Sequence, residues 1–141
     1  MYLQQGRTEL NTQVNFRQDL AQLIAKLQSD GSGVIIMGDF NVNMRDPYKH
    51  LSATLDTAAM TDVHRYMHPD LEPTNTWDRG QHQIDYIYAS SNLLPYIALA
   101  GIEPFGEHTT TDHRGLFTDI RLSDFLGGET NPIAAPTLRG I

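Results

Sequence analysis

Apolar residues near the start of the chain recur every three or four positions, which predicts an amphipathic helix over residues 11–27. The positions that form this stripe are Phe16, Leu20, Leu23, Ile24 and Leu27. Asn11 or Thr12 can cap the start of this helix, and the Asp-Gly-Ser-Gly run at 30–33 ends it.

A short, continuous apolar run, Val-Ile-Ile-Met, follows at 34–37. Its β-branched residues predict a strand that is buried on both faces, with helices or a second sheet packed above and below it. Residues 38–47 are rich in Asn, Asp and Gly, and they predict a loop. A second helix is expected over 48–60, because Leu51, Leu55 and Ala59 share one face.

The remainder of the chain predicts mostly strands, at 75–77, 83–89, 96–102 and 116–120, and then a short helix at 123–126. Residues 127–141 are rich in Gly, Pro and Ala and lack a periodic apolar face, so we expect a flexible tail. This order of helices and strands indicates an α+β or α/β domain built in layers.

Composition narrows the class of protein. The 141 residues, 40% hydrophobic and 19% charged, suit one soluble globular domain. No apolar run is long enough to cross a bilayer, so we expect no membrane partner. The absence of cysteine excludes disulfides and zinc–thiolate sites and fits an intracellular, reducing compartment. A net charge of −7 argues against a broad basic surface for nucleic acid, although clustered carboxylates can bind a metal ion.

Gly-Asp-Phe-Asn at 38–41 is the first candidate for chemistry. Gly38 lets the backbone turn at the end of the strand, and Asp39 and Asn41, two residues apart, project to the same side. A carboxylate beside an amide can hold and orient a water for attack on phosphorus. Taken alone, the four residues favour a turn in which Asp39 and Asn41 only make side-chain hydrogen bonds.

A second candidate is the strand at 83–89. Alternation places Tyr86 and Tyr88 with Ile84 on one face, and Asp85 on the other, which is otherwise built for burial. A buried carboxylate costs several kcal/mol unless it is paired or hydrogen-bonded, so Asp85 requires a partner, structural or catalytic.

The Asp-His pair at 112–113, just before the last strand, is a candidate for that partner. A carboxylate next to an imidazole can bind metal or phosphate, and a second carboxylate can orient the His. The alternative is a solvated Asp-His-Arg turn.

In this order, Gly-Asp-Phe-Asn, Ile-Asp-Tyr-Ile and Asp-His resemble the DNase I-like endonuclease/exonuclease/phosphatase family. Between them, Asp-Val-His-Arg at 62–65 and the stretch 74–77 resemble the segment before the family's Asp-Tyr strand. The resemblance covers about residues 11–122.

The resemblance implies a metal-dependent phosphodiesterase. Asp39 would orient or deprotonate the attacking water, and Asn41 would hold that water and a phosphate oxygen. Asp85 would pair with His113, which when charged would stabilise the transition state. Asp112, and with it Asp39, would bind the ion, Mg²⁺ with Mn²⁺ as the alternative.

The resemblance also implies a four-layered α/β/β/α sandwich of two halves, of which this chain is the C-terminal one (1–126), followed by the tail at 127–141. The family's first half supplies a metal-binding Asn and Glu in motifs that residues 1–30 do not contain, and Glu9, the single glutamate there, lies at a helix start and not in an inner strand. We therefore expect an exposed apolar sheet face, incomplete activity of the chain alone, and the missing N-terminal half as a partner.

Three functions remain open at this stage. The first is endonucleolytic cleavage of DNA, as in a retrotransposon-type endonuclease, which the residues 124–127 and 136–140 resemble faintly. The second is hydrolysis of a small or lipid phosphate by the same site. The third is an inactive remnant that acts only by binding.

Two further features have structural interpretations. His64 and His68 are four residues apart, as in zinc sites, but no third ligand follows at suitable spacing, so a structural role is favoured. Trp77 can stack on a base, but a lone Trp in a strand is usually part of a core.

Overall fold

The computed structural model of the protein describes residues 2–47, 49–107 and 110–128. Most of the predicted tail at 127–141 lies outside these residues, so its flexibility and the boundary at 126 stay predictions. Within the described part, no helix is both long and apolar enough to cross a membrane.

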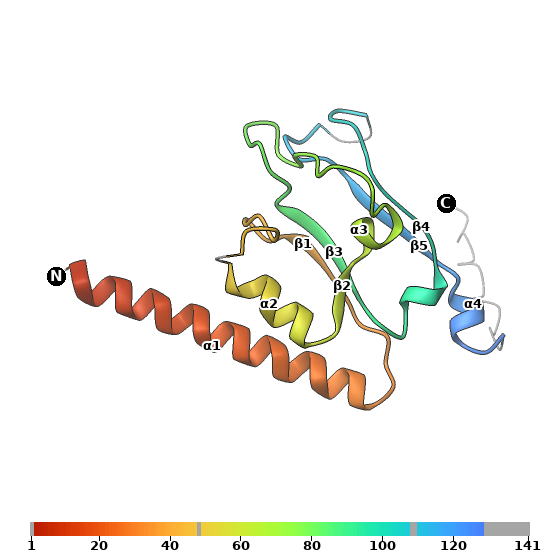
Figure 1. Ribbon diagram of the computed structural model, residues 1–141, viewed down its shortest axis with the longest axis horizontal. Coiled ribbons are helices and arrows are strands. Elements are labelled where there is room, and N and C mark those ends of the chain that lie inside the picture. Colours follow the sequence, from red (N-terminus) through yellow and green to blue (C-terminus); the bar gives the residue numbers. More distant parts are fainter. Residues whose placement is uncertain (1, 48, 108–109, 129–141) are drawn as a thin grey trace, which may run out of the picture.

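The described residues form two antiparallel sheets with helices around them (Figure 1). A three-stranded sheet has the order β1-β3-β2, and a two-stranded sheet pairs β4 with β5. The strands are β1 (Ile35–Asp39), β2 (Met60–Asp62), β3 (Asp85–Ser90), β4 (Ile97–Ile102) and β5 (Leu116–Ile120). The helices are α1 (Tyr2–Ser29), α2 (His50–Thr57), α3 (Val63–Met67), the 3-10 helix η1 (Leu94–Tyr96) and α4 (Leu122–Phe125).

Strand β3 lies at the centre of the fold and separates two cores. Tyr86 and Tyr88 pack with Ile24 of α1 and Leu55 of α2. Residues on the other face of β3, among them Ile87, pack with residues of α3, η1 and β4. The predicted alternation of the two faces is confirmed. The result is a layered α+β architecture, as the sequence predicts.

Helix α1 is longer than predicted and buries only part of the predicted stripe. It begins at Tyr2, so the predicted cap at Asn11 or Thr12 is wrong, because the preceding residues include strong helix formers (Leu, Gln, Arg and Glu) and no proline. Ile24 is 1% exposed, but Phe16 and Leu23 are 57% and 54% exposed. Only one edge of the apolar stripe is therefore buried, where Ile24 packs with Leu55 of α2 and the tyrosines of β3.

Strand β1 is not buried on both faces as predicted. It is an edge strand of its sheet, and Met37 is 64% exposed. The register pairs Ile35 with Ala89 and Met37 with Ile87, so these exposed side chains lie on the same face as the second core. The expected exposed apolar sheet face is thus observed at β1.

Three elements differ from the predicted pattern between α2 and β3. Helix α2 ends before Ala59, whose φ of 56° is left-handed, and the short elements β2 and α3 follow, unpredicted. The predicted strand at 75–77 reduces to one isolated bridge between Trp77 and His113. Such short elements leave too few residues for a recognisable hydrophobic period.

Candidate active site

Two carboxylates lie side by side at one end of the three-stranded sheet. Asp39, the last residue of β1, pairs in register with Asp85, the first residue of β3. Partners in an antiparallel pair project to the same face, with Cβ atoms about 5 Å apart. The pairing continues one step further, since the backbone N–H of Phe40 donates to the carbonyl of Ile84 at 2.8 Å.

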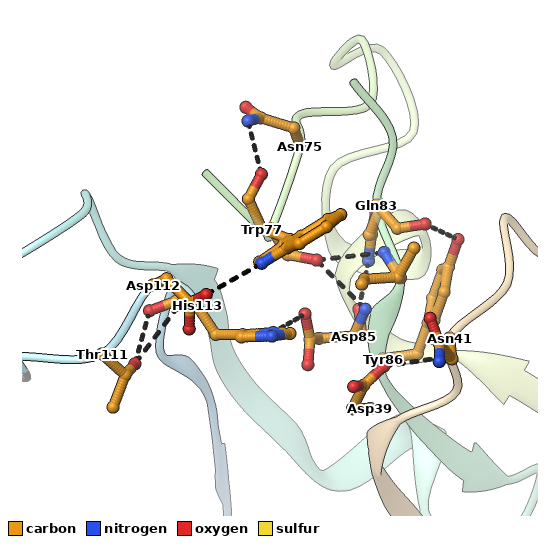
Figure 2. A network of polar contacts seen from close by, with 12 residues as sticks. Asp39, Asn41, Asn75, Trp77, Gln83, Asp85, Tyr86, Thr111, Asp112 and His113 are labelled. Atoms are coloured by element: carbon orange, nitrogen blue, oxygen red, sulfur yellow. Dashed lines mark hydrogen bonds and ion pairs between the residues drawn. The ribbon is translucent and has the colours of Figure 1, made fainter. Parts of the chain in front are cut away.

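The chain turns away from the sheet at Asn41, not at Gly38 as predicted. Gly38 stays within β1 opposite Tyr86, with a φ of 147° that side-chain-bearing residues rarely adopt. Asn41 has a left-handed φ of 54°, and its backbone N–H donates to Oδ1 of Asp39 at 2.7 Å. Asn tolerates this conformation better than most residues. The turn therefore fixes one oxygen of Asp39 and keeps Asn41 beside it (Figure 2).

Asp85 and His113 form the predicted pair. The Nδ1 atom of His113 lies 2.9 Å from Oδ2 of Asp85. Because a carboxylate only accepts, Nδ1 carries the proton and Nε2 is left for another partner. The hydrogen bond to Asp85 raises the pKa of His113, and the negative charges of Asp85, Asp39 and Asp112 act in the same direction. The pair thus favours an oriented, positively charged imidazole.

Asp39, Asp85 and His113 form one group. Each offers a ligand atom, and these atoms lie within 4.8 Å of one another. Figure 2 shows the three side chains converging from β1, β3 and the segment before β5. Carboxylate oxygens are the ligands that a hard cation such as Mg²⁺ prefers, so Asp39, one of the two residues predicted to hold the ion, fits it in this group.

Asp112 points to a different partner. Its Oδ2 accepts a hydrogen bond from Nε1 of Trp77 at 3.0 Å, and this bond lowers the pKa of the Asp112 carboxyl. Asp112 is outside the group of three that the described residues form. A carboxylate has several acceptor positions, so this bond leaves Asp112 able to bind an ion. Its role as a metal ligand stays a prediction.

Sequence reasoning missed two residues that support this group. Thr76 is fully buried, and its Oγ1 accepts from the backbone N–H groups of Ile84 and Asp85. Gln83 is 3% exposed, and its side-chain amide donates to the carbonyl of Asp85 at 3.0 Å. Isolated polar residues such as Thr76 and Gln83 give no periodic sign of burial in a sequence. The only available signal was that this stretch lies just before the Asp-Tyr strand.

Comparison with known proteins assigns the class. Residues 4–113 match the Endonuclease/Exonuclease/phosphatase family, and the chain belongs to that family. No match was found among curated proteins.

Among solved structures, the fold is similar to a 3′ phosphatase, NExo, from Neisseria, bound to a product DNA hairpin, with a TM-score of 0.65 and 13% identity. The alignment covers 79% of this chain and 54% of that one, so the chain spans about half the length of this structural relative. At this identity the likeness shows the fold alone.

Proposed function

We propose that the site hydrolyses phosphate diesters with the help of a divalent metal ion, and that its substrate is DNA, cleaved endonucleolytically. The observation that carries the proposal is the hydrogen-bonded Asp85–His113 pair next to Asp39, at one end of the three-stranded sheet. Family membership supports phosphoester hydrolysis. The DNA hairpin bound by the structural relative favours a nucleic-acid substrate.

In the proposed reaction, a water attacks phosphorus in line with the leaving oxygen. Asp39 accepts a proton from this water or orients it, and Asn41 helps to hold it against the phosphate. His113, kept in place and charged by Asp85, stabilises the negative charge that develops on the phosphoryl oxygens. Each role matches the type and position of its side chain: acceptor, amide and cation.

Mg²⁺, with Mn²⁺ as an alternative, would be held by Asp39 and Asp112. When bound, the ion supplies positive charge that polarises the phosphate. In this proposal the chain's own groups orient the substrate, because His113, held by Asp85, and Asn41, next to Asp39, can both contact the phosphate.

The test is nicking of supercoiled plasmid in Mg²⁺. We expect Asp39→Ala and His113→Ala to abolish nicking. The matched controls are Asp19→Ala and His50→Ala, at exposed positions of α1 and α2, and both should retain it. Nicking that survives both site changes would exclude this assignment. The chain spans about half of its structural relative, so the wild type can be a weak nuclease. Weak nicking that is lost in both site variants still supports the assignment.

A phosphatase acting at DNA 3′ ends is the second candidate, favoured by the activity in the printed description of the structural relative. Release of phosphate from a 3′-phosphorylated hairpin without plasmid nicking would favour it. Hydrolysis of soluble or lipid phosphates alone would assign the site to small or lipid substrates. A chain that binds DNA but hydrolyses none of these substrates would be a binding remnant.

A further inference from the structure

The segment 75–78 has no regular secondary structure, yet it lies against the residues on both sides of His113. The backbone N–H of Asp78 donates to the carbonyl of Asp112 at 2.9 Å, and the N–H of Arg114 donates to the carbonyl of Thr76 at 2.8 Å. Between these two bonds, Trp77 forms an isolated antiparallel bridge with His113. The backbone that carries His113 is therefore held on both sides by this segment.

The side chain of Thr76 connects the same segment to Asp85. Its Oγ1 accepts from the N–H of Ile84 at 3.0 Å and from the N–H of Asp85 at 3.1 Å. Thr76 is 0% exposed, so water does not replace these bonds. One residue thus binds the backbone of Asp85 through its hydroxyl and the backbone of Arg114 through its carbonyl. Thr76 therefore connects the backbone of Asp85 with the backbone next to His113.

Trp77 acts on the third acidic residue of the site. Its Nε1–H donates to Oδ2 of Asp112 (Figure 2). Gly80 lies close to the indole, since a Cβ added there would lie 3.0 Å from Cε3 of Trp77. The side-chain amide of Asn75 donates to the carbonyls of both Trp77 and Gly80 at 3.0 Å, which closes the turn between them.

We propose that Thr76 and Trp77 are positioning residues for the reaction: Thr76 holds Asp85 and His113 at bonding distance, and Trp77 holds the Asp112 carboxylate at the same rim. The inference rests on the proposed function for its catalytic meaning, but its geometric content does not depend on activity. A displacement of about 1 Å at a reacting group can cost roughly 100-fold in rate. Residues that touch no substrate can therefore control the rate through these hydrogen bonds.

Thr76→Val and Thr76→Ser test the first half. Val has a similar shape but no acceptor, whereas Ser keeps the hydroxyl. We expect Thr76→Val to lower kcat roughly 100-fold with less than about twofold change in KM. Thr76→Ser should restore kcat to within about threefold of wild type, because it restores both hydrogen bonds. If Thr76→Val does not fold, Thr76→Ala, which removes the same acceptor, takes its place with the same expectation.

A spectroscopic readout separates positioning from general packing. In wild type, the Nδ1 proton of His113 should give a low-field NMR signal, because it is bonded to a carboxylate. We expect this signal to be lost or shifted in Thr76→Val and retained in Thr76→Ser. A signal unchanged in Thr76→Val, or equally lost in Thr76→Ser, would overturn the role of the Thr76 hydroxyl.

The single tryptophan of the chain makes the second half equally testable, since the indole gives one Nε1–H resonance. We expect Asp112→Asn to shift that resonance. Trp77→Phe keeps an aromatic ring but removes the hydrogen-bond donor. The fold-loss of kcat in the double variant Trp77→Phe/Asp112→Asn should therefore be smaller than the product of the two single fold-losses. An unshifted resonance or multiplicative losses would overturn the role of Trp77. Wild type inactive on every phosphate ester would reject the proposed function, while both NMR comparisons still decide the positioning.

Discussion

The carboxylate of Asp85 and the imidazole of His113 meet at 2.9 Å although 28 residues separate them along the chain. Their side chains are only 14% and 31% exposed, so solvent weakens this contact less than it would a surface ion pair. The neighbouring Asp39 completes a group of three side chains whose ligand atoms lie within 4.8 Å of one another.

The first prediction concerns pH. Because the Asp85 hydrogen bond raises the pKa of His113, the charged imidazole persists above the usual value near 6.5. We expect activity to fall as pH rises through this raised pKa. Asp85→Asn should move the alkaline fall to lower pH and reduce kcat about 100-fold or more, as measured by rate–pH profiles. His50→Ala serves as the control, and an alkaline fall that Asp85→Asn does not move would contradict the pairing.

The same shift affects stability, with a defined sign. A histidine whose pKa is raised by folding stabilises the native state fully below its unfolded value near 6.5. That contribution is lost as pH rises through the folded pKa. Urea unfolding of wild type and His113→Asn should therefore differ more at pH 5.5 than at pH 9. An equal difference at both would contradict the raised pKa.

The site was partly predictable from sequence because its motifs are local. The alternation in β3 gave the correct faces for Tyr86 and Asp85, since a period of two needs only a few residues to be recognised. The last strand was predicted with the bounds that β5 has. The Gly-Asp-Phe-Asn motif was also recognisable as a local pattern at the end of a strand, although the turn falls at Asn41.

Non-local relationships were not predictable in the same way. The bond from Trp77 to Asp112 joins residues 35 apart, and no single motif contains both. Met37 pairs with Ile87, which lies in the second core, yet Met37 is exposed, so its burial depends on which elements pack over that face of β1. The burial of Thr76 follows from backbone donors in another strand. Long-range partners decide these features, whereas sequence patterns report neighbours within about two turns of helix or one strand.

Substitutions of Asn41 can separate its part in the backbone turn from the role proposed for its side-chain amide. Its φ of 54° disfavours a side chain such as Ala, so Asn41→Ala should destabilise the fold by about 1–2 kcal/mol in urea unfolding. Asn41→Gly should keep stability close to wild type, because glycine adopts this conformation freely. If the amide contributes to the reaction, both variants lose at least about tenfold in kcat. Full activity in Asn41→Gly would mean that Asn41 serves only the turn.

Asp62 carries a raised pKa because burial penalises its charged form, although its Oδ1 accepts from the N–H of Arg65 at the start of α3. A raised folded pKa means that native stability falls as pH rises from about 3.8 through that pKa. Asp62→Asn keeps an oxygen for the cap and removes the charge, so it should be relatively more stable at pH 7 than at pH 3.5. Asp119→Asn, at an exposed position of β5, is the matched control. A larger gain at pH 3.5 than at pH 7 would contradict the burial of the charge.

Tyr86 joins the loop after Asp39 to the start of β3. Its hydroxyl accepts from the N–H of Met44 at 3.0 Å and donates to the carbonyl of Gln83 at 2.8 Å, and the residue is 2% exposed. Tyr86→Phe removes both bonds and leaves two buried groups unsatisfied, so we expect a loss of about 1–3 kcal/mol in urea unfolding. Tyr66→Phe, at a side chain 47% exposed, should change stability by less than about 0.5 kcal/mol. Equal, small effects at both positions would mean that the loop is held by its apolar contacts alone.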